Sequence, residues 1–125
     1  MNKKNNILVE VQPRYMAEQS KPDEQKYAFA YTVKISNIGT TAAKLLSRHW
    51  LIIDSNGKIE EVRGEGVIGE KPYLKPGEAF TYTSGALLAT SVGVMRGKYS
   101  MRSESGEEFD TEIPQFTLSI PRVLH

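Results

Sequence analysis

Large apolar residues alternate with small or polar ones along most of the chain. Between residues 26 and 38, the odd-numbered positions are large and apolar as far as Ile35, and the even-numbered positions are small or polar as far as Ser36. Successive side chains of a β-strand point to opposite faces, so this alternation predicts a strand with one buried face. Residues 7–11 repeat the pattern, and the following Pro13 is typical of an edge strand or of a strand's end.

Residues 44–54 differ because they are apolar on both faces. Strict alternation places Leu46, Trp50 and Ile52 on one face and Leu45, Leu51 and Ile53 on the other. The segment is therefore predicted as a central, well-covered strand with Trp50 as its core aromatic residue. The sequence Asp-Ser-Asn-Gly at 54–57 is a strong turn signal, which predicts a hairpin with its returning strand at 58–62.

Turn residues mark two further strands. Lys-Pro-Gly-Glu at 75–78 predicts a turn that opens an alternating strand at 79–84. Residues 95–102 alternate in the same way and end at the turn Glu-Ser-Gly-Glu, residues 104–107. We therefore expect each of these segments to present one face to the core.

The C-terminal segment changes phase at a proline. Apolar side chains and Thr111 alternate from 109 to 113 until Pro114 interrupts the pattern, and Phe116, Leu118 and Ile120 resume it one residue out of phase. A β-bulge at Pro114 would add one residue to this strand and keep both halves facing the core. We predict that bulge.

The elements together predict an all-β protein. Seven or eight short strands, with no segment that favours a helix of ten or more residues, indicate an immunoglobulin or fibronectin type III-like antiparallel β-sandwich. A closed barrel is the alternative. A length of 125 residues suits one domain, so residues 1–125 are predicted to form a single one.

Charge and cysteine content exclude several classes of function. Sixteen Lys and Arg against fifteen Asp and Glu give a net charge of +1, which provides no general attraction to nucleic acid or to an anionic membrane. The chain has no cysteine, which excludes disulfides, thiolate zinc sites and a cysteine nucleophile. We find no signal peptide and no apolar run near the ~20 residues that span a bilayer, so we expect a cytoplasmic protein without membrane insertion.

The string Gly64-Glu65-Gly66-Val67-Ile68-Gly69 has the G-x-G-x-x-G form of phosphate-binding loops. Pro72 and Pro76 follow where a dinucleotide site requires a helix, which argues against that kind of site. Two interpretations remain. The string forms a backbone nest for a phosphate, with Arg63 and Lys71 supplying charge, or its glycines allow positive φ and close backbone approach in a long connection between the two sheets.

Other polar residues carry weaker signals. His49 has no partners at a recognisable metal-ligand spacing, so we predict no metal site and assign it a structural role on the outer face. Ser47 and His49 lie two residues apart on one strand, about 6.5–7 Å between Cα atoms, so we predict no catalytic residues. The basic stripe, Arg96, Lys98 and Arg102, is predicted to be a solvated face paired with acidic side chains of the next strand, namely Glu107, Glu108, Asp110 or Glu112.

A resemblance to a known family covers the chain from about residue 7 to residue 121. The motifs that carry it are QSKP at 19–22, YAFAYTV at 27–33, LLSRHW at 45–50, EVRGEGVIG at 61–69, LKPGE at 74–78, YTSG at 82–85 and GKYSM at 97–101. In this order they resemble the bacterial ApaG family, also called CorD. The resemblance implies a fibronectin type III-like sandwich, a genetic link to cobalt and magnesium efflux or tolerance, and domains that mediate protein contacts in eukaryotic multidomain proteins.

We therefore expect a non-enzymatic module that binds another protein. The expected surface is the glycine string with its neighbours: Arg63, Gly64, Gly66, Gly69, Lys71 and Tyr73. The alternative is a small-ligand sensor that binds pyrophosphate, a nucleotide or a divalent cation at the same loop. We expect no cofactor, and either a monomer or a dimer, because exposed strand edges allow pairing between copies.

Overall fold

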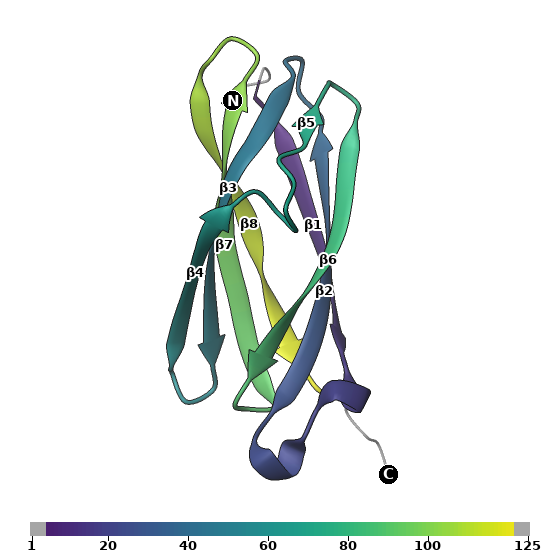
Figure 1. Ribbon diagram of the computed structural model, residues 1–125, viewed down its shortest axis with the longest axis vertical. Coiled ribbons are helices and arrows are strands. Elements are labelled where there is room, and N and C mark those ends of the chain that lie inside the picture. The colour runs from purple at the N-terminus through teal and green to yellow at the C-terminus, as the bar shows by residue number, and fades with distance from the viewer. Residues whose placement is uncertain (1–4, 122–125) are drawn as a thin grey trace.

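The computed structural model describes residues 5–121, which form eight β-strands and two short 3₁₀ helices (Figure 1). The elements are β1 (Ile7–Tyr15), η1 (Ala17–Gln19), η2 (Pro22–Glu24), β2 (Tyr27–Asn37), β3 (Ala43–Asp54), β4 (Ile59–Glu65), β5 (Tyr73–Leu74), β6 (Ala79–Leu88), β7 (Val92–Ser103) and β8 (Glu108–Ser119). Across residues 5–121, neither helix is long and apolar enough to cross a membrane.

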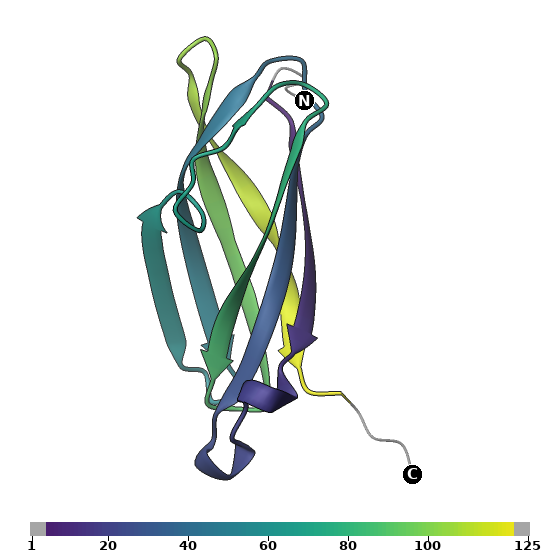
Figure 2. The ribbon, with the colours of Figure 1, turned by 45° about the vertical axis from the view of Figure 1, so that its right-hand side comes forward.

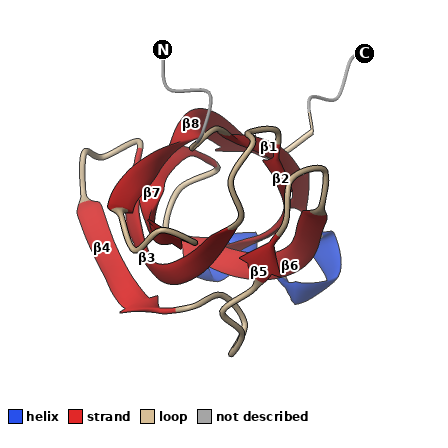
Figure 3. Ribbon diagram, turned by 90° about the horizontal axis from the view of Figure 1, so that it is seen from above, coloured by secondary structure: helices blue, strands red, loops and turns tan. Residues whose placement is uncertain are grey.

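The strands form two antiparallel sheets that pack face to face, as Figures 2 and 3 show. One sheet has the order β1-β2-β6, and the other has the order β4-β3-β7-β8 with β5 paired to β3. This is the predicted fibronectin type III-like sandwich and not a closed barrel. β1 pairs only with β2 among the described strands, so Pro13 lies on an edge strand, where a missing N–H costs no ladder bond.

Trp50 lies at the centre of the core between the sheets. Its side chain is 2% exposed and makes edge-on contacts with Tyr31, Tyr99 and Phe116 at centroid distances of 5.3, 6.4 and 5.9 Å. Edge-to-face packing of this kind adds to the stabilisation from burial itself. The alternation along β2 is confirmed, because Phe29 and the odd-numbered positions to Ile35 are buried.

The bulge predicted at Pro114 is confirmed. Met95 lies opposite Phe116 and Gly97 lies opposite Ile113, so β8 has two residues, Pro114 and Gln115, where β7 has one. The extra residue restores the phase of the inward face, and Leu118 is fully buried. Proline suits this position because a bulge residue does not need to donate to the ladder.

A second bulge, in β3, was not expected. Leu45 lies opposite Met101 and Ser47 opposite Ser100, which leaves Leu46 without a partner on β7. The shift places Leu45 in the core at 0% exposure and leaves Leu46 only half-buried. The prediction that Leu46 shares the core face with Trp50 is therefore wrong, because strict alternation does not hold through a bulge.

Alanine substitutions at these two leucines test the bulge. Leu45→Ala is expected to lower the free energy of unfolding by about 2–5 kcal/mol, because it leaves a cavity in the core. Leu46→Ala is expected to cost about 1 kcal/mol or less, since that side chain remains partly in water. Urea unfolding followed by Trp50 fluorescence measures both changes. A larger loss for Leu46→Ala would contradict the assigned register.

Candidate functional site

The six residues predicted as a site lie together at one end of β4 and in the segment after it. Arg63 and Gly64 lie in β4, just before its end at residue 65. Gly66, Gly69 and Lys71 lie in the loop 66–72, and Tyr73 begins β5. The loop leaves β4, passes toward β6 and then rises to β5 (Figure 1). β4 and β5 pair with the same edge of β3, so the loop protrudes from the sheet at the point where the partner of β3 changes from β4 to β5.

The β3 bulge holds both ends of this loop. At its start, the N–H of Gly66 donates to the carbonyl of Leu46 at 2.9 Å. At its end, the N–H of Leu45 donates to the carbonyl of Pro72 at 3.0 Å. A bulge leaves backbone groups outside the regular ladder, and here those groups bind the loop.

The tip of the loop is a closed turn. The N–H of Val67 donates to the Glu70 carbonyl at 2.8 Å, and the N–H of Glu70 donates back at 2.9 Å. The two central residues, Ile68 and Gly69, have φ values of +43° and +80°, the positive pair typical of a type I′ turn. Val67 is fully buried in the hydrophobic core, so it anchors the turn to the sandwich.

Gly66 is required by both its conformation and its surroundings. Its φ is +63°, and a Cβ at this position would lie 2.3 Å from the carbonyl oxygen of Glu70. No side chain, not even the methyl group of alanine, fits at this position unless the backbone of the turn moves. The structural interpretation of the glycine string is confirmed at Gly66 in its positive φ and close backbone approach. The expectation that the string connects the two sheets is wrong, because it joins β4 to β5, which both pair with β3 in the five-stranded sheet.

Arg48 fixes the loop from the inner side of the sheet, a role that sequence reasoning missed. Its Nη1 donates to the carbonyls of Glu65 at 3.1 Å and Gly66 at 2.9 Å. Gly64 lies opposite Arg48 in the β3–β4 register, and a Cβ there would come within 2.8–2.9 Å of the guanidinium atoms. The available signal was an arginine two residues before Trp50, on the inward face, opposite a glycine.

The two predicted cations of the site are paired with carboxylates. Arg63 Nε lies 3.0 Å from Glu61 Oε1, and Lys71 Nζ lies 3.3 Å from Glu65 Oε2. The hydrogen bond from Arg63, and after it the nearby His49, hold the pKa of Glu61 below its ordinary value. These acids balance much of the positive charge that a phosphate would require.

Two large apolar side chains are exposed at the loop. Ile68 at the tip is 57% exposed, and Tyr73 at the start of β5 is 49% exposed. The adjacent Leu74 is buried, so β5 turns one apolar side chain inward and the other outward. Ile68 was not among the predicted site residues, because neither its conformation nor its exposure is visible in the sequence.

The remaining predicted polar residues lie on the outer face of the five-stranded sheet. His49 Nε2 is 3.4 Å from Glu61 Oε2, and no group of three or more His, Asp or Glu side chains within residues 5–121 is arranged to hold a metal ion. The predicted pairing of the basic stripe is confirmed at two positions, Lys98 with Asp110 at 3.3 Å and Arg102 with Glu108 at 3.1 Å.

Behind Arg48, buried tyrosines form a polar group in the core. Tyr99 lies opposite Arg48 in the β3–β7 register, and its hydroxyl is hydrogen-bonded to that of Tyr82. Burial raises the pKa of Tyr82 to about 12, and burial together with the neighbouring Tyr82 also raises the pKa of Tyr99. Both hydroxyls therefore stay neutral in the folded protein at ordinary pH.

Alanine substitutions at two glycines of the loop distinguish a steric requirement for glycine from a conformational one. Gly69→Ala is expected to cost about 1 kcal/mol, because only the positive φ opposes it and no atom lies within 4 Å of the new Cβ. Gly66→Ala is expected to cost roughly 1–3 kcal/mol more, because the Cβ also collides with the Glu70 carbonyl. Thermal and urea unfolding measure both. Equal costs would contradict the close contact at Gly66.

Stability is expected to fall at high pH. The unfolded chain releases the Tyr82 proton at the ordinary pKa of 10.0, whereas the folded protein retains it to about 12. Unfolding therefore becomes easier as the pH rises through this window, by on the order of 2 kcal/mol. Urea titrations across the window measure the slope. Tyr82→Phe is expected to reduce the slope without abolishing it, since Tyr99 remains; an unchanged slope would contradict this assignment.

Comparisons with known proteins agree on one family. The sequence model of the ApaG domain family matches residues 17–103 of this chain. The Protein ApaG of Thiobacillus denitrificans is 56% identical over 123 residues, which cover 98% of this chain and 97% of that protein. The Protein ApaG of Xanthomonas euvesicatoria is 56% identical over 119 residues, 95% of this chain and 94% of its own length.

Solved structures agree with the sequence relatives. A crystal structure from Bordetella pertussis, described as an ApaA protein, superposes with a TM-score of 0.95 at 48% identity and covers 98% of this chain and 100% of its own. A protein from Archaeoglobus fulgidus with a TM-score of 0.53 at 12% identity shares the fold alone. On the family match and the close relatives together, this chain belongs to the ApaG family.

Proposed function

We propose that this protein is a non-enzymatic interaction module that binds another protein through the loop surface, defined as Ile68, Tyr73, the flanking pair Glu65–Lys71, and Arg63. The observation that carries the proposal is Ile68. It is a β-branched residue held in the left-handed region at φ +43° and 57% exposed at the tip of the turn.

That conformation disfavours isoleucine. A left-handed backbone costs roughly 1–2 kcal/mol for a residue with a Cβ, and a β-branched residue there is an outlier. The side chain recovers little of this by burial, because most of it faces water. Strained residues cluster at ligand-contacting positions, where the surrounding structure holds them in place. Here the Val67–Glu70 hydrogen bonds hold Ile68 outward.

The surroundings of Ile68 match a protein interface better than a phosphate cradle. Tyr73 adds a second exposed apolar residue, and tyrosine is enriched at protein interfaces. The Glu65–Lys71 ion pair and Arg63 add charged side chains on the same segment of the chain. An apolar centre with a polar margin is the usual arrangement of a protein-binding surface.

The finer expectations belong to the same proposal. The cytoplasmic location expected from the sequence is one of them, and the link to cobalt and magnesium efflux implied by the family resemblance is the other. We assign that link to the bound partner, whose identity the proposal leaves to experiment.

Substitution at the tip tests the loop surface. Ile68→Asn is expected to fold at least as stably as the natural protein, because asparagine tolerates the left-handed region. Its affinity for the partner is expected to fall by about tenfold or more, the loss typical of a central interface residue. The matched control is Ile59→Asn, at a side chain 58% exposed at the far end of β4.

Quantitative affinity capture from the native host measures the effect. Proteins enriched on the natural chain and on Ile59→Asn, but lost on Ile68→Asn, would support the proposal. A set unchanged by Ile68→Asn would contradict it, because the tip would then contribute nothing to recognition. Thermal unfolding of each variant shows that the comparison is between folded proteins.

A ligand sensor is the second candidate, and one observation favours it. The backbone N–H groups of Ile68 and Gly69 have no hydrogen-bond acceptor among residues 5–121, and such groups bind anions in backbone nests. Pyrophosphate titrated into isotope-labelled protein is expected to shift the amide signals of residues 63–71 if the loop binds it. Signals that remain in place at about millimolar pyrophosphate would contradict anion binding by these backbone N–H groups.

A further inference from the structure

The edge of β6 lacks the features that usually keep strand edges apart. Among the described strands β6 pairs only with β2, and its other edge is open. Residues 79–95 carry no charged side chain and no proline. The other edge strands differ, since β1 contains Pro13 and Arg14 and β4 contains Glu60 and Glu61. Charges and prolines on edges prevent pairing with another chain, and β6 has neither.

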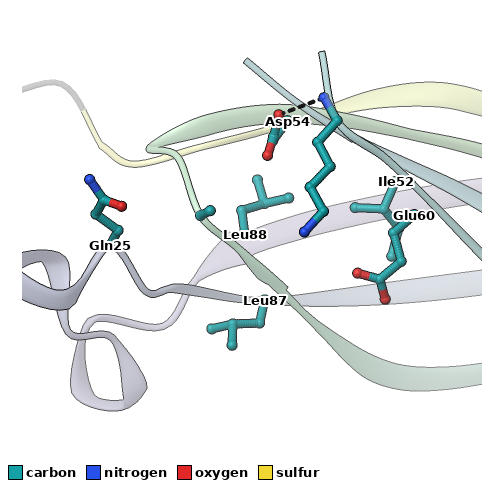
Figure 4. Close-up of a pocket in the computed structure, with 8 residues that line it drawn as sticks. Gln25, Ile52, Asp54, Glu60, Leu87 and Leu88 are labelled. Carbon is teal, nitrogen blue, oxygen red and sulfur yellow. Dashed lines mark hydrogen bonds between the residues drawn. The ribbon is translucent and has the colours of Figure 1, made fainter. Parts of the chain in front are cut away.

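The C-terminal end of β6 also carries exposed apolar surface. Leu87 is 56% exposed, whereas the next residue, Leu88, is buried. Figure 4 shows the two side chains on opposite sides of the β6 ribbon, with Leu88 on the side of Ile52 and Asp54. Leu87 thus projects from the outer face of the three-stranded sheet, at the strand's free edge.

A shallow hollow lies beside Leu87 on the same outer face. Its apolar lining comes from small residues, Ala28, Ala30 and Gly85, together with Met16 and Leu87 itself. Gly85 faces Ala30, and Leu87 faces Ala28, across the β2–β6 pairing. The strand therefore presents a projecting leucine and, two residues earlier, a position with no side chain.

We propose that this edge pairs with the same edge of a second copy of the chain. In an antiparallel pair with its two-fold axis at Ala86, Leu87 of each copy lies directly opposite Gly85 of the other. Cross-strand partners have Cβ positions about 4.5–5.5 Å apart, so each leucine covers the small-residue hollow of its neighbour. Leu87 and the hollow lie on the same strand, so a two-fold axis places Leu87 of each copy against the hollow of the other.

The absence of charge selects a second copy as the occupant. A two-fold pairing of identical strands places side chains of the same short segment opposite one another, so a charged edge would meet its own charge. β6 carries none, and the pairing has no such repulsion. The result is one continuous sheet of six strands across two molecules. The axis lies near the end of β6, away from the loop surface in Figure 1, so both surfaces can be occupied together.

Sedimentation equilibrium over about 1 µM to about 1 mM protein tests the proposal. The average molecular mass of the natural protein is expected to rise from 14.0 kDa toward twice that value as its concentration increases. Gly85→Val is expected to weaken the dimer by about tenfold or more because it fills the hollow. It should remain folded, since a Cβ there meets only the Phe29 carbonyl oxygen at 3.4 Å and valine favours strands.

Two further variants make the outcome decisive. Leu87→Lys is expected to weaken the dimer to a similar extent by placing a charge on the edge. Ile38→Lys is the matched control, because Ile38 is also 56% exposed but lies outside β6, and it should dimerise normally. A natural chain that stays monomeric would overturn the proposal and leave the edge to a strand of another protein. A dimer insensitive to both β6 variants would overturn it as well.

Discussion

The inner face of β3 holds the core and the loop in place at the same time. Trp50 packs edge-on against aromatic rings from both sheets, and Arg48, two residues earlier, binds the carbonyls at the end of β4 and the start of the loop. The bulge between Leu45 and Ser47 sets the phase of this face. The hydrogen bonds that hold both ends of the loop thus depend on one strand keeping its register.

Much of the fold follows from sequence patterns, and the exceptions have identifiable causes. Alternation predicted the strands, and the phase change of the apolar pattern at Pro114 predicted the bulge there. The bulge at Leu46 has no such signal, and a segment that is apolar on both faces looks the same in either phase. The glycines predicted tight turns and close approach. They did not predict Arg48 or Ile68, whose roles come from contacts between strands distant in the sequence.

The near-neutral net charge conceals an uneven distribution. On the five-stranded sheet, basic and acidic side chains of adjacent strands face each other as ion pairs. Exposed pairs of this kind contribute little stability, but they keep that sheet polar. The edge strand β6 has no charge at all. The five-stranded sheet therefore presents a charged, hydrated face, whereas the β6 edge of the other sheet is suited to backbone pairing.

The attachment of the loop to β3 has a consequence for how the protein could change over evolution. Both ends of the loop are hydrogen-bonded to the β3 bulge, and Val67 is buried beneath the tip. The outermost residues, Ile68 and Gly69, bear none of these attachments. These two positions can be substituted within the limits of a left-handed turn while the scaffold stays the same. Such a separation would let recognition diversify at two positions without a new fold.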